Sequence, residues 1–540
     1  MTGSRTGRTP AVAVSMLAAS ALFVAACGSD DRATAAASVV SAGFEGPVQS
    51  APDPAELETG EGQSAVIGSY SIGEFEGIDI WVDPVSGNDA NDGHDRDHAM
   101  QTVNAAWQAI PSGTQLQTGY RVRLVAGSYS QATSVNYWED RHGTASAPVI
   151  VEAADGAHTA TFEGDINMFD VSHFALIGVD IVGEGDAFHC ESCDHILISD
   201  AELSGGADAH ETVKFNQSQH VYIEYSDIHG ADDNAIDFVA VQYGHVIGSR
   251  IHDAQDWCMY AKGGSAYITF SGNEVFDCGT GGITAGQGTG FEFMVAPFLN
   301  YEAYGIQIVN NVVHDTEGAG LGVAGGFNVM FAYNTLYNVG TRSHLVEFVH
   351  GRRGCDGAIA TCTANHDAGG WGSADNEEPM IPNRHISFVD NIIVNPAGVQ
   401  SEWQQIQVDG PLQPVASSGV PSPSLADDDL RIEGNIIWNG PADHPLGLGD
   451  GCADTNATCN ETQLRAANAI NTIEPRLRDP ANGDYMLADE SRAQLIAAVD
   501  VPAFIWDGTP LTVPVLVQEA DVSTDFAGVA RVDGGPPGAG

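Results

Sequence analysis

Two lysines and a run of aspartates are the residues of this chain whose types and spacing could do chemistry. Of its 20 Lys and Arg residues, only Lys214 and Lys262 are lysines. The run from Asp232 through Asp233 to Asp237 places three carboxylates within six residues. Carboxylate oxygens are the ligands that a hard cation such as Ca²⁺ prefers. The run therefore predicts a calcium site, with a solvated acidic turn as the alternative.

A lysine near a bound cation is a candidate general base, because the cation lowers the lysine's pKa and frees it to accept a proton. We expect Lys262 to be this base, and Lys214 and Arg250 to stabilise charge in the same catalytic set. The alternative is that Lys262, which precedes two glycines, only keeps the end of a strand soluble.

The elements that must position these residues form an internal repeat. Each unit alternates apolar and polar residues up to a turn position, and uninterrupted units are 22 to 25 residues long. The turn positions are Val179, Ala201, Ser226, Ser249, Asn273, Asn311, Asn334, Asn391 and Asn435. Five of them are Asn, whose side-chain amide can bond the next unit.

Units of this length with strand periodicity stack as parallel coils around one core. A leucine-rich repeat has a similar period, but its Leu-x-x-Leu-x-Leu signature is absent. The sequence thus predicts an all-β, right-handed parallel β-helix (solenoid). It also predicts a capping helix at 103–110 and long inserted loops at 291–304 and 351–376.

Aligning the coils places one outward-facing position twelve residues before the turn positions Ala201, Ser226, Ser249 and Asn273. These positions are His189, Lys214, Asp237 and Ala261, which Lys262 follows, and inspection of two later coils adds Thr284 and Glu347 to the predicted column. Neighbours such as Val213 and Phe215 are apolar and should point inward. The column brings both lysines beside an aspartate. We expect His189, Glu347 and Arg342 to contact a substrate there.

The segment that begins Trp81-Val-Asp-Pro-Val-Ser-Gly-Asn-Asp and the ending Asp484-Tyr-Met-Leu resemble the pectate-lyase-like β-helix superfamily. This fold hosts lyases, hydrolases, esterases, epimerases and non-catalytic surface proteins. The aspartate run is similar to the calcium-binding cluster of family 9 polysaccharide lyases, in which a lysine on a later coil is the base. It departs from that pattern at Asn234, where a second consecutive aspartate is expected.

This resemblance implies calcium-assisted β-elimination on a uronic-acid polysaccharide. The cation neutralises the carboxylate beside C5, and the lysine removes the C5 proton. A hydrolase is an alternative, because Asp232, Asp233 and Glu347 could supply an acid and a base. The competing class is a non-catalytic glycan-binding or surface-structural protein. The net charge of -52 favours it, since the chain repels a polyanion, and argues against nucleic acid as a partner.

The first 26 residues predict a lipoprotein signal peptide, with Cys27 as the acylated residue. We expect a flexible tether at 27–77, the β-helix at 78–470 and a C-terminal cap segment at 471–540. The protein would be an exported monomer, held to the cell envelope by its lipid alone. In a two-membrane cell this would be the outer membrane.

Eight cysteines remain after Cys27, and export into an oxidising compartment favours disulfides. Their spacing suggests four local pairs: Cys190-Cys193, Cys258-Cys278, Cys355-Cys362 and Cys452-Cys459. Zinc is the alternative at the first pair, where His189 and His195 are neighbours.

Overall fold

The computed structural model describes residues 69–73, 75–206, 209–374, 380–441, 443–448, 450–489, 499–501, 520, 522–531 and 538–539. The chain divides into two units, residues 1–59 and 60–540, and the first lies wholly outside the described residues. The expected signal peptide, the expected lipid site at Cys27 and most of the tether therefore also lie outside them.

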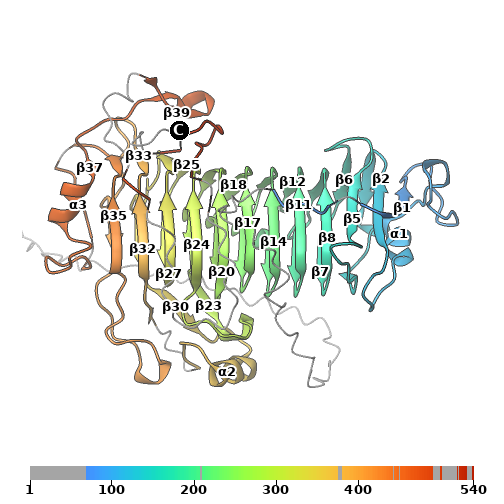
Figure 1. Cartoon of the computed structure of the whole chain (residues 1–540), viewed down its shortest axis with the longest axis horizontal. Coiled ribbons are helices and arrows are strands. Elements are labelled where there is room, and N and C mark those ends of the chain that lie inside the picture. The colour runs from blue at the N-terminus through green and yellow to red at the C-terminus, as the bar shows by residue number, and fades with distance from the viewer. Residues whose placement is uncertain are drawn as a thin grey trace, which may run out of the picture. The chain divides into compact units, whose positions relative to one another are not determined.

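Three parallel sheets form the β-helix of the second unit, and each complete coil adds one strand to each sheet (Figure 1). Sheet A comprises β1 (Gly77–Val82), β2 (Gly119–Leu124), β5 (Val149–Ala153), β8 (Ser172–Ile177), β11 (Asp194–Ser199), β14 (Gln219–Glu224), β17 (Gln242–Ile247), β20 (Ser265–Ser271), β24 (Ala303–Val309), β27 (Gly326–Ala332), β32 (Arg384–Val389) and β35 (Asp428–Glu433).

Sheet B follows sheet A along each coil. It comprises β3 (Gly127–Ser130), β6 (Ala160–Glu163), β9 (Val179–Val182), β12 (Glu202–Ser204), β15 (Asp227–His229), β18 (Arg250–Ala254), β21 (Glu274–Cys278), β25 (Val312–Thr316), β28 (Thr335–Tyr337), β33 (Ile392–Val394), β36 (Ile436–Trp438) and β37 (Ala469–Ile470).

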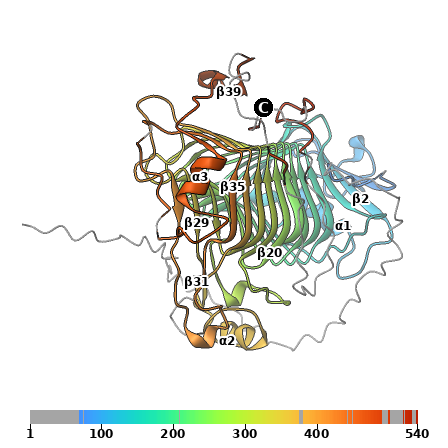
Figure 2. The same ribbon diagram turned by 60° about the vertical axis from the view of Figure 1, so that its left-hand side comes forward.

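Sheet C completes each coil. It comprises β4 (Trp138–Glu139), β7 (Ile166–Phe169), β10 (Phe188–Glu191), β13 (Glu211–Asn216), β16 (Asn234–Val239), β19 (Trp257–Lys262), β22 (Gly281–Ala285), β26 (Ala319–Ala324), β29 (Val346–Val349) and β34 (Ile406–Val408). The predicted all-β parallel β-helix is thus confirmed, and Figure 2 shows the stacked coils in an oblique view.

Alternation of side chains along each strand explains why these segments coil around one core. In β13, Val213 and Phe215 are fully buried inside, whereas Lys214 between them points outward. Aligned apolar residues on all three sheets form one continuous hydrophobic cluster. Burying apolar surface contributes roughly 25 cal/mol per Å², so this core is the main source of stability.

The predicted Asn positions form a ladder at the corner between sheets A and B. Each buried amide nitrogen donates to the side-chain oxygen on the next coil at 2.8–3.0 Å. The members are the five predicted residues Asn273, Asn311, Asn334, Asn391 and Asn435, together with Asn468, which was not predicted. The ladder satisfies polar groups that would otherwise be buried without partners at this corner.

Short helices close both ends of the core. Helix α1 (Val103–Ala109) buries Val103, Ala106 and Trp107, and the side chain of Thr102 caps it by accepting from the amide of Ala105. The predicted capping helix is therefore present. At the opposite end, α3 (Glu461–Ala467) buries Leu464. No helix among the described residues is long and apolar enough to cross a bilayer.

The inserted loops form a small layer beside the coils (Figure 1). It contains β23 (Gly288–Gly290), β30 (Gly351–Gly354), β31 (Met380–Ile381) and α2 (Ile359–Ala368). The fully buried side chain of Arg353 lies 2.6 Å from Glu302 and donates to the carbonyl of Tyr301. Glu302 also accepts from the amide of Gly263, so this layer is fixed to the turn that follows Lys262.

Segments expected to be a tether and a cap lie along the coils. Tyr70 stacks on Tyr222 of β14, with ring centroids 4.2 Å apart. Near the other end of the chain, β38 (Leu477–Asp479) pairs with β39 (Asp484–Leu487), and Tyr485 packs against Val312 of sheet B. Ala520 packs against Val309 and Val389.

All four expected disulfides are present, which confirms the pairing. Because Cys190 and Cys193 are bonded to each other, their sulfurs are not available as zinc ligands.

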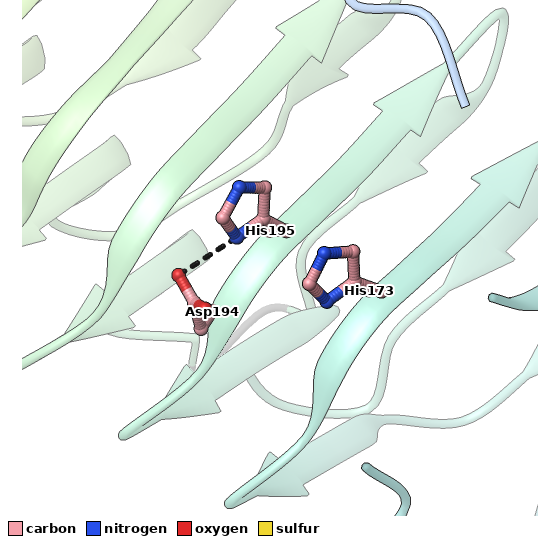
Figure 3. A group of neighbouring side chains, drawn as sticks. All are labelled: His173, Asp194 and His195. Carbon is pink, nitrogen blue, oxygen red and sulfur yellow. Dashed lines mark ion pairs between the residues drawn. The ribbon is translucent and has the colours of Figure 1, made fainter. Parts of the chain in front are cut away.

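Stacked rings also run along the outside of the coils. On sheet A, the rings of His173, His195 and His220 follow one another on β8, β11 and β14. Figure 3 shows the first two rings, with Asp194 beside them. The centroid separations of 4.3 and 4.1 Å reflect the spacing of about 4.8 Å between parallel strands.

Candidate functional site

One column of aligned side chains follows the outer face of sheet C, and we call it the sheet C row. Strand register places one member on each coil. The members are His189, Lys214, Asp237, Tyr260, Thr284, Gly322, Glu347 and Gln407. The sequence-derived column is therefore observed except at one position.

That position is Tyr260, where the sequence alignment placed Ala261. Ala261 pairs with Phe238 and is fully buried in the core. The error arises because the turn between β19 and β20 is one residue longer than the corresponding turn on the preceding coil, between β16 and β17. Val239 precedes Gln242 by three residues, but their partners Lys262 and Ala266 are four apart. The turn contains Gly263 and Gly264, both with positive φ.

Lys214 is held between two buried carboxylates. Its ammonium lies 2.8 Å from Glu211 Oε1 and 3.3 Å from Asp237 Oδ2. Burial alone would lower the pKa of Lys214, but the charges of Asp237 and Glu211 raise it. Lys214 therefore stays protonated near neutral pH and serves as a fixed positive charge, not as a base.

The two carboxylates share this single cation. Asp237 is only 1% exposed, and its Oδ1 has no hydrogen-bond partner in the described structure. Burial, together with the charge of Asp237, raises the pKa of Glu211 to about 8. The group has more negative charge than Lys214 can compensate, so it favours an additional proton or cation.

Lys262 lies two residues beyond Tyr260 on the same strand. Its Nζ donates to Tyr260 Oη at 2.9 Å and to Gln287 Oε1 at 3.1 Å, and it lies 4.2 Å from the centre of the tyrosine ring. Tyr260 is almost fully buried, which raises the pKa of its phenol. The phenol therefore stays neutral and accepts a hydrogen bond from the ammonium of Lys262 without compensating its charge.

The predicted calcium ligands are not gathered as a set of three. Asp232 is exposed, whereas Asp237 lies in the row beside Lys214. Asp233 instead lies with His210 and Glu211, and one ligand atom from each of the three falls within 4.8 Å of the others. Burial and the nearby charge of Asp256 raise the pKa of Asp233 to about 6.

These donors fit a divalent cation only in part. Asp233 and Glu211 offer the oxygen ligands that calcium prefers, but the imidazole of His210 is not a typical calcium ligand. Lys214 already occupies the side of Glu211 that faces Asp237. The set that fits a cation is thus centred on Asp233 and Glu211.

Near the far end of the row, Glu347 and the indole of Trp257, which is not a member of the row, both lie close to Gly322. Burial is the main cause that raises the pKa of Glu347 to about 7. Trp257 lies against Gly322, where an added Cβ would be 2.8 Å from the indole ring and 3.2 Å from Glu347. Glycine is therefore required at this member of the row for Trp257 to pack there.

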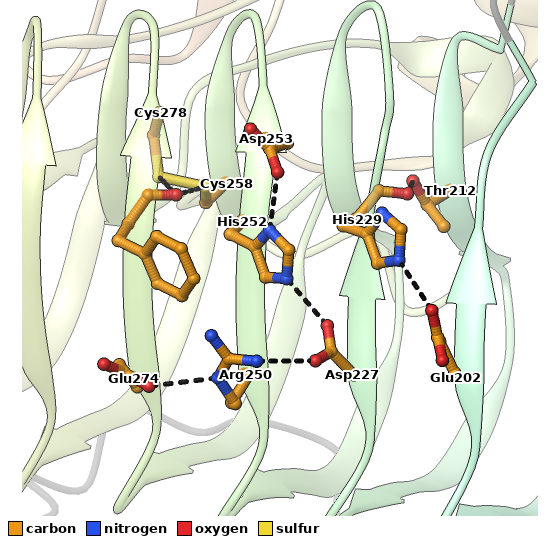
Figure 4. Close-up of polar contacts among 11 residues, drawn as sticks. Glu202, Thr212, Asp227, His229, Arg250, His252, Asp253, Cys258, Glu274 and Cys278 are labelled. Atoms are coloured by element: carbon orange, nitrogen blue, oxygen red, sulfur yellow. Dashed lines mark hydrogen bonds and ion pairs between the residues drawn. A yellow bond between two sulfur atoms is a disulfide. The ribbon is translucent and has the colours of Figure 1, made fainter. Parts of the chain in front are cut away.

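Arg250 and Arg342, also predicted from the sequence, lie apart from the lysines. Arg250 is on sheet B, where it binds Asp227 at 2.9 Å and Glu274 at 3.1 Å (Figure 4). Arg342 is exposed in the segment before β29 and pairs with Glu317. The row therefore contains His189, Lys214, Asp237 and Glu347 of the predicted residues, with Lys262 beside it.

Sequence reasoning missed His210, Glu211, Tyr260 and Gln287. Glu211 and Tyr260 lie three and two residues before the two lysines, and this spacing was the available signal. Gln287 carried no such signal, because it comes from the following coil.

Comparison with known families supports the fold. Residues 186–356 match the family model described as the right handed beta helix region. No curated protein sequence matches the chain. The chain therefore has the right-handed parallel β-helix expected from its resemblance to the pectate-lyase-like superfamily.

Solved structures with a similar fold include three whose names describe enzymes that act on polysaccharides. Pectate lyase Pel9A is 14% identical, with a TM-score of 0.39 over 61% of this chain and 78% of its own. A rhamnogalacturonan lyase is 13% identical, with a TM-score of 0.42 over 66% of this chain and 87% of its own. The A-module of the Azotobacter vinelandii mannuronan C-5 epimerase AlgE4 is 12% identical, with a TM-score of 0.38 over 63% of this chain and 88% of its own. At these values the likeness assigns no activity to this chain.

Proposed function

We propose that the sheet C row binds a linear polysaccharide and that Lys262 removes the C5 proton of a uronic-acid residue in β-elimination. The observation that carries this proposal is the row itself, which places one polar or small residue per coil along a single face. A linear polymer of repeating sugars is the ligand class that suits a linear repeat of side chains.

The roles within the row follow from charge and contacts. Lys214 is committed to Glu211 and Asp237, so it supplies fixed positive charge near the substrate carboxylate. Lys262 is hydrogen-bonded to two neutral groups, Tyr260 and Gln287, and is therefore our candidate for the general base. His189 and Glu347 would contact sugars on either side.

We also propose that Asp233 and Glu211 bind a calcium ion. A calcium ion held there would neutralise the uronate carboxylate. The expected location, exported and anchored through a lipid at Cys27, is likewise a proposal. The four disulfides support it, because such bonds persist in oxidising compartments.

A second candidate is a non-catalytic glycan-binding or surface-structural protein. One observation favours it, because both lysines already have partners within the protein. In that case the row would bind sugar hydroxyls without catalysing a reaction.

Ultraviolet absorbance of unsaturated uronate tests the proposal. Protein lacking residues 1–27 would be assayed on pectate, alginate and glycosaminoglycans, with calcium or with a chelator. We expect a signal with at least one polymer that is lost in Lys262→Ala but retained in Arg465→Ala, which alters an exposed cation of α3. Retention of a glycan without any signal would support the binding protein instead.

A further inference from the structure

The stacked histidines on sheet A form a second group of ionisable side chains, on a different face from the sheet C row. His173, His195 and His220 occupy aligned positions on three successive coils. Their backbones share positive φ values of 50°, 55° and 53°. Positive φ is uncommon for residues other than glycine, so its recurrence on three coils keeps the rings in one position.

Asp194 lies at the edge of this stack, as Figure 3 shows. Its Oδ1 is 2.9 Å from His195 Nδ1 and accepts a hydrogen bond from His220 Nδ1 at 2.8 Å. Asp194 therefore lies beside the Nδ1 atoms of both His195 and His220. One atom each of His173, Asp194 and His195 lie within 4.8 Å of one another.

One ring nitrogen at this place is buried and, within the described residues, has neither a hydrogen bond nor an ion-pair partner: the Nδ1 atom of His173. The Nδ1 atom of His195 is also buried, but it lies 2.9 Å from Asp194 Oδ1. Buried polar atoms are nearly always satisfied in native structures, so an unpartnered nitrogen beside a carboxylate needs an explanation. A bound cation provides one, because imidazole nitrogen is a metal ligand when it is not protonated.

We propose that His173, Asp194 and His195 bind a divalent transition-metal ion such as Zn²⁺ or Ni²⁺. Two imidazoles and one carboxylate form a donor set that suits these metals, whereas calcium and magnesium prefer oxygen ligands alone. Three protein ligands leave a further coordination position for water. The proposal is independent of the sheet C row and of its activity.

Binding requires a small rotation of one ring. The planes of His173 and His195 are 6° apart, and nitrogen lone pairs lie in those planes, so the two lone pairs do not converge on one point as the rings stand. His173 is the end member of a stack that continues through His195 and His220 to Tyr243 and Tyr267. Its ring can rotate about the side-chain bonds and lose one ring contact, which leaves the pair of His195 and His220 intact.

Isothermal titration of the purified full chain with ZnCl₂, NiCl₂ and CaCl₂ tests this site. We expect saturable binding of one Zn²⁺ or Ni²⁺ per chain, and no calcium binding that depends on His173. His173→Phe keeps an aromatic ring in the stack but removes both nitrogens. It should weaken Zn²⁺ binding on the order of 10- to 100-fold.

A matched control is His385→Phe, because His385 lies on the same sheet and also pairs with an aspartate, Asp429. This variant should bind zinc as the unchanged chain does. Melting temperatures without metal separate folding from binding. Both variants should melt close to the parent, and zinc should raise the melting temperature of the parent and of His385→Phe but not of His173→Phe.

Absence of saturable binding of both zinc and nickel would overturn the proposal. Unchanged binding in His173→Phe would also overturn it, as would equal losses in both variants, which would assign the metal to scattered surface histidines.

Discussion

Lys262 Nζ lies 2.9 Å from the phenolic oxygen of Tyr260, and both side chains belong to one strand of the β-helix. The buried phenol stays neutral because burial raises its pKa. Lys262 is therefore hydrogen-bonded to neutral groups, whereas Lys214, two coils earlier, is paired with carboxylates. This difference is why we propose Lys262, and not Lys214, as the base.

Tyr260→Phe should lower the turnover number of the proposed lyase about 10-fold while leaving the fold intact. The ring still packs, but Lys262 loses one of its two hydrogen-bond partners and its position is less well fixed. Initial rates and melting curves would be measured together. A turnover number equal to that of the parent would show that Tyr260 does not position the lysine.

Lys214→Met should destabilise the protein by about 3–5 kcal/mol, because it leaves Glu211 and Asp237 buried without a compensating charge. Chemical denaturation would measure the loss. Adding Glu211→Gln and Asp237→Asn to the same chain should recover much of it, since the buried charges are then removed. Failure of this triple variant to recover stability would mean that Lys214 acts through packing.

Glu347→Gln should change how stability depends on pH. The pKa of Glu347 in the folded protein is about 7, above its ordinary value of 4.5, so the folded state binds the extra proton. The stability that this proton confers is complete below pH 4.5 and is lost as the pH rises through 7.

Melting curves of the parent and Glu347→Gln between pH 4 and pH 8 would test this. The parent should lose more stability over that range than the variant, and the two should differ most at pH 8. Parallel pH profiles would argue that Glu347 titrates normally.

Gly322→Ala should destabilise the protein by roughly 1–3 kcal/mol, because the new Cβ would lie 2.8 Å from the ring of Trp257. Gly288→Ala is the matched control, since its Cβ would make only an ordinary contact, 3.4 Å from the side chain of Arg352. Denaturation midpoints of the two variants would be compared. Equal midpoints would show that Trp257 moves freely.

Much of the fold was predictable because one repeat dictates it. The turn positions such as Asn311 and Asn334 fixed the coil length, and the alternation around Lys214 fixed which residues face outward. The four disulfides followed from spacing. These features depend on local pattern, which the sequence contains in full.

The site was less predictable because it depends on small departures from the repeat. One extra residue at Gly263 and Gly264 moved the column from Ala261 to Tyr260. Arg250 follows the turn position Ser249 directly, which places it on sheet B and away from the lysines. The contact of Lys262 with Gln287 joins two coils, and the repeat pattern does not determine it.

Mass spectrometry of the products tests the central claim most directly. The chain and its Lys262→Ala variant would be incubated with each polymer that gives an ultraviolet signal. Our account predicts oligosaccharides lighter by one molecule of water than hydrolysis products, formed by the parent and not by the variant. Products of hydrolytic mass, or unsaturated products formed equally well by Lys262→Ala, would contradict it.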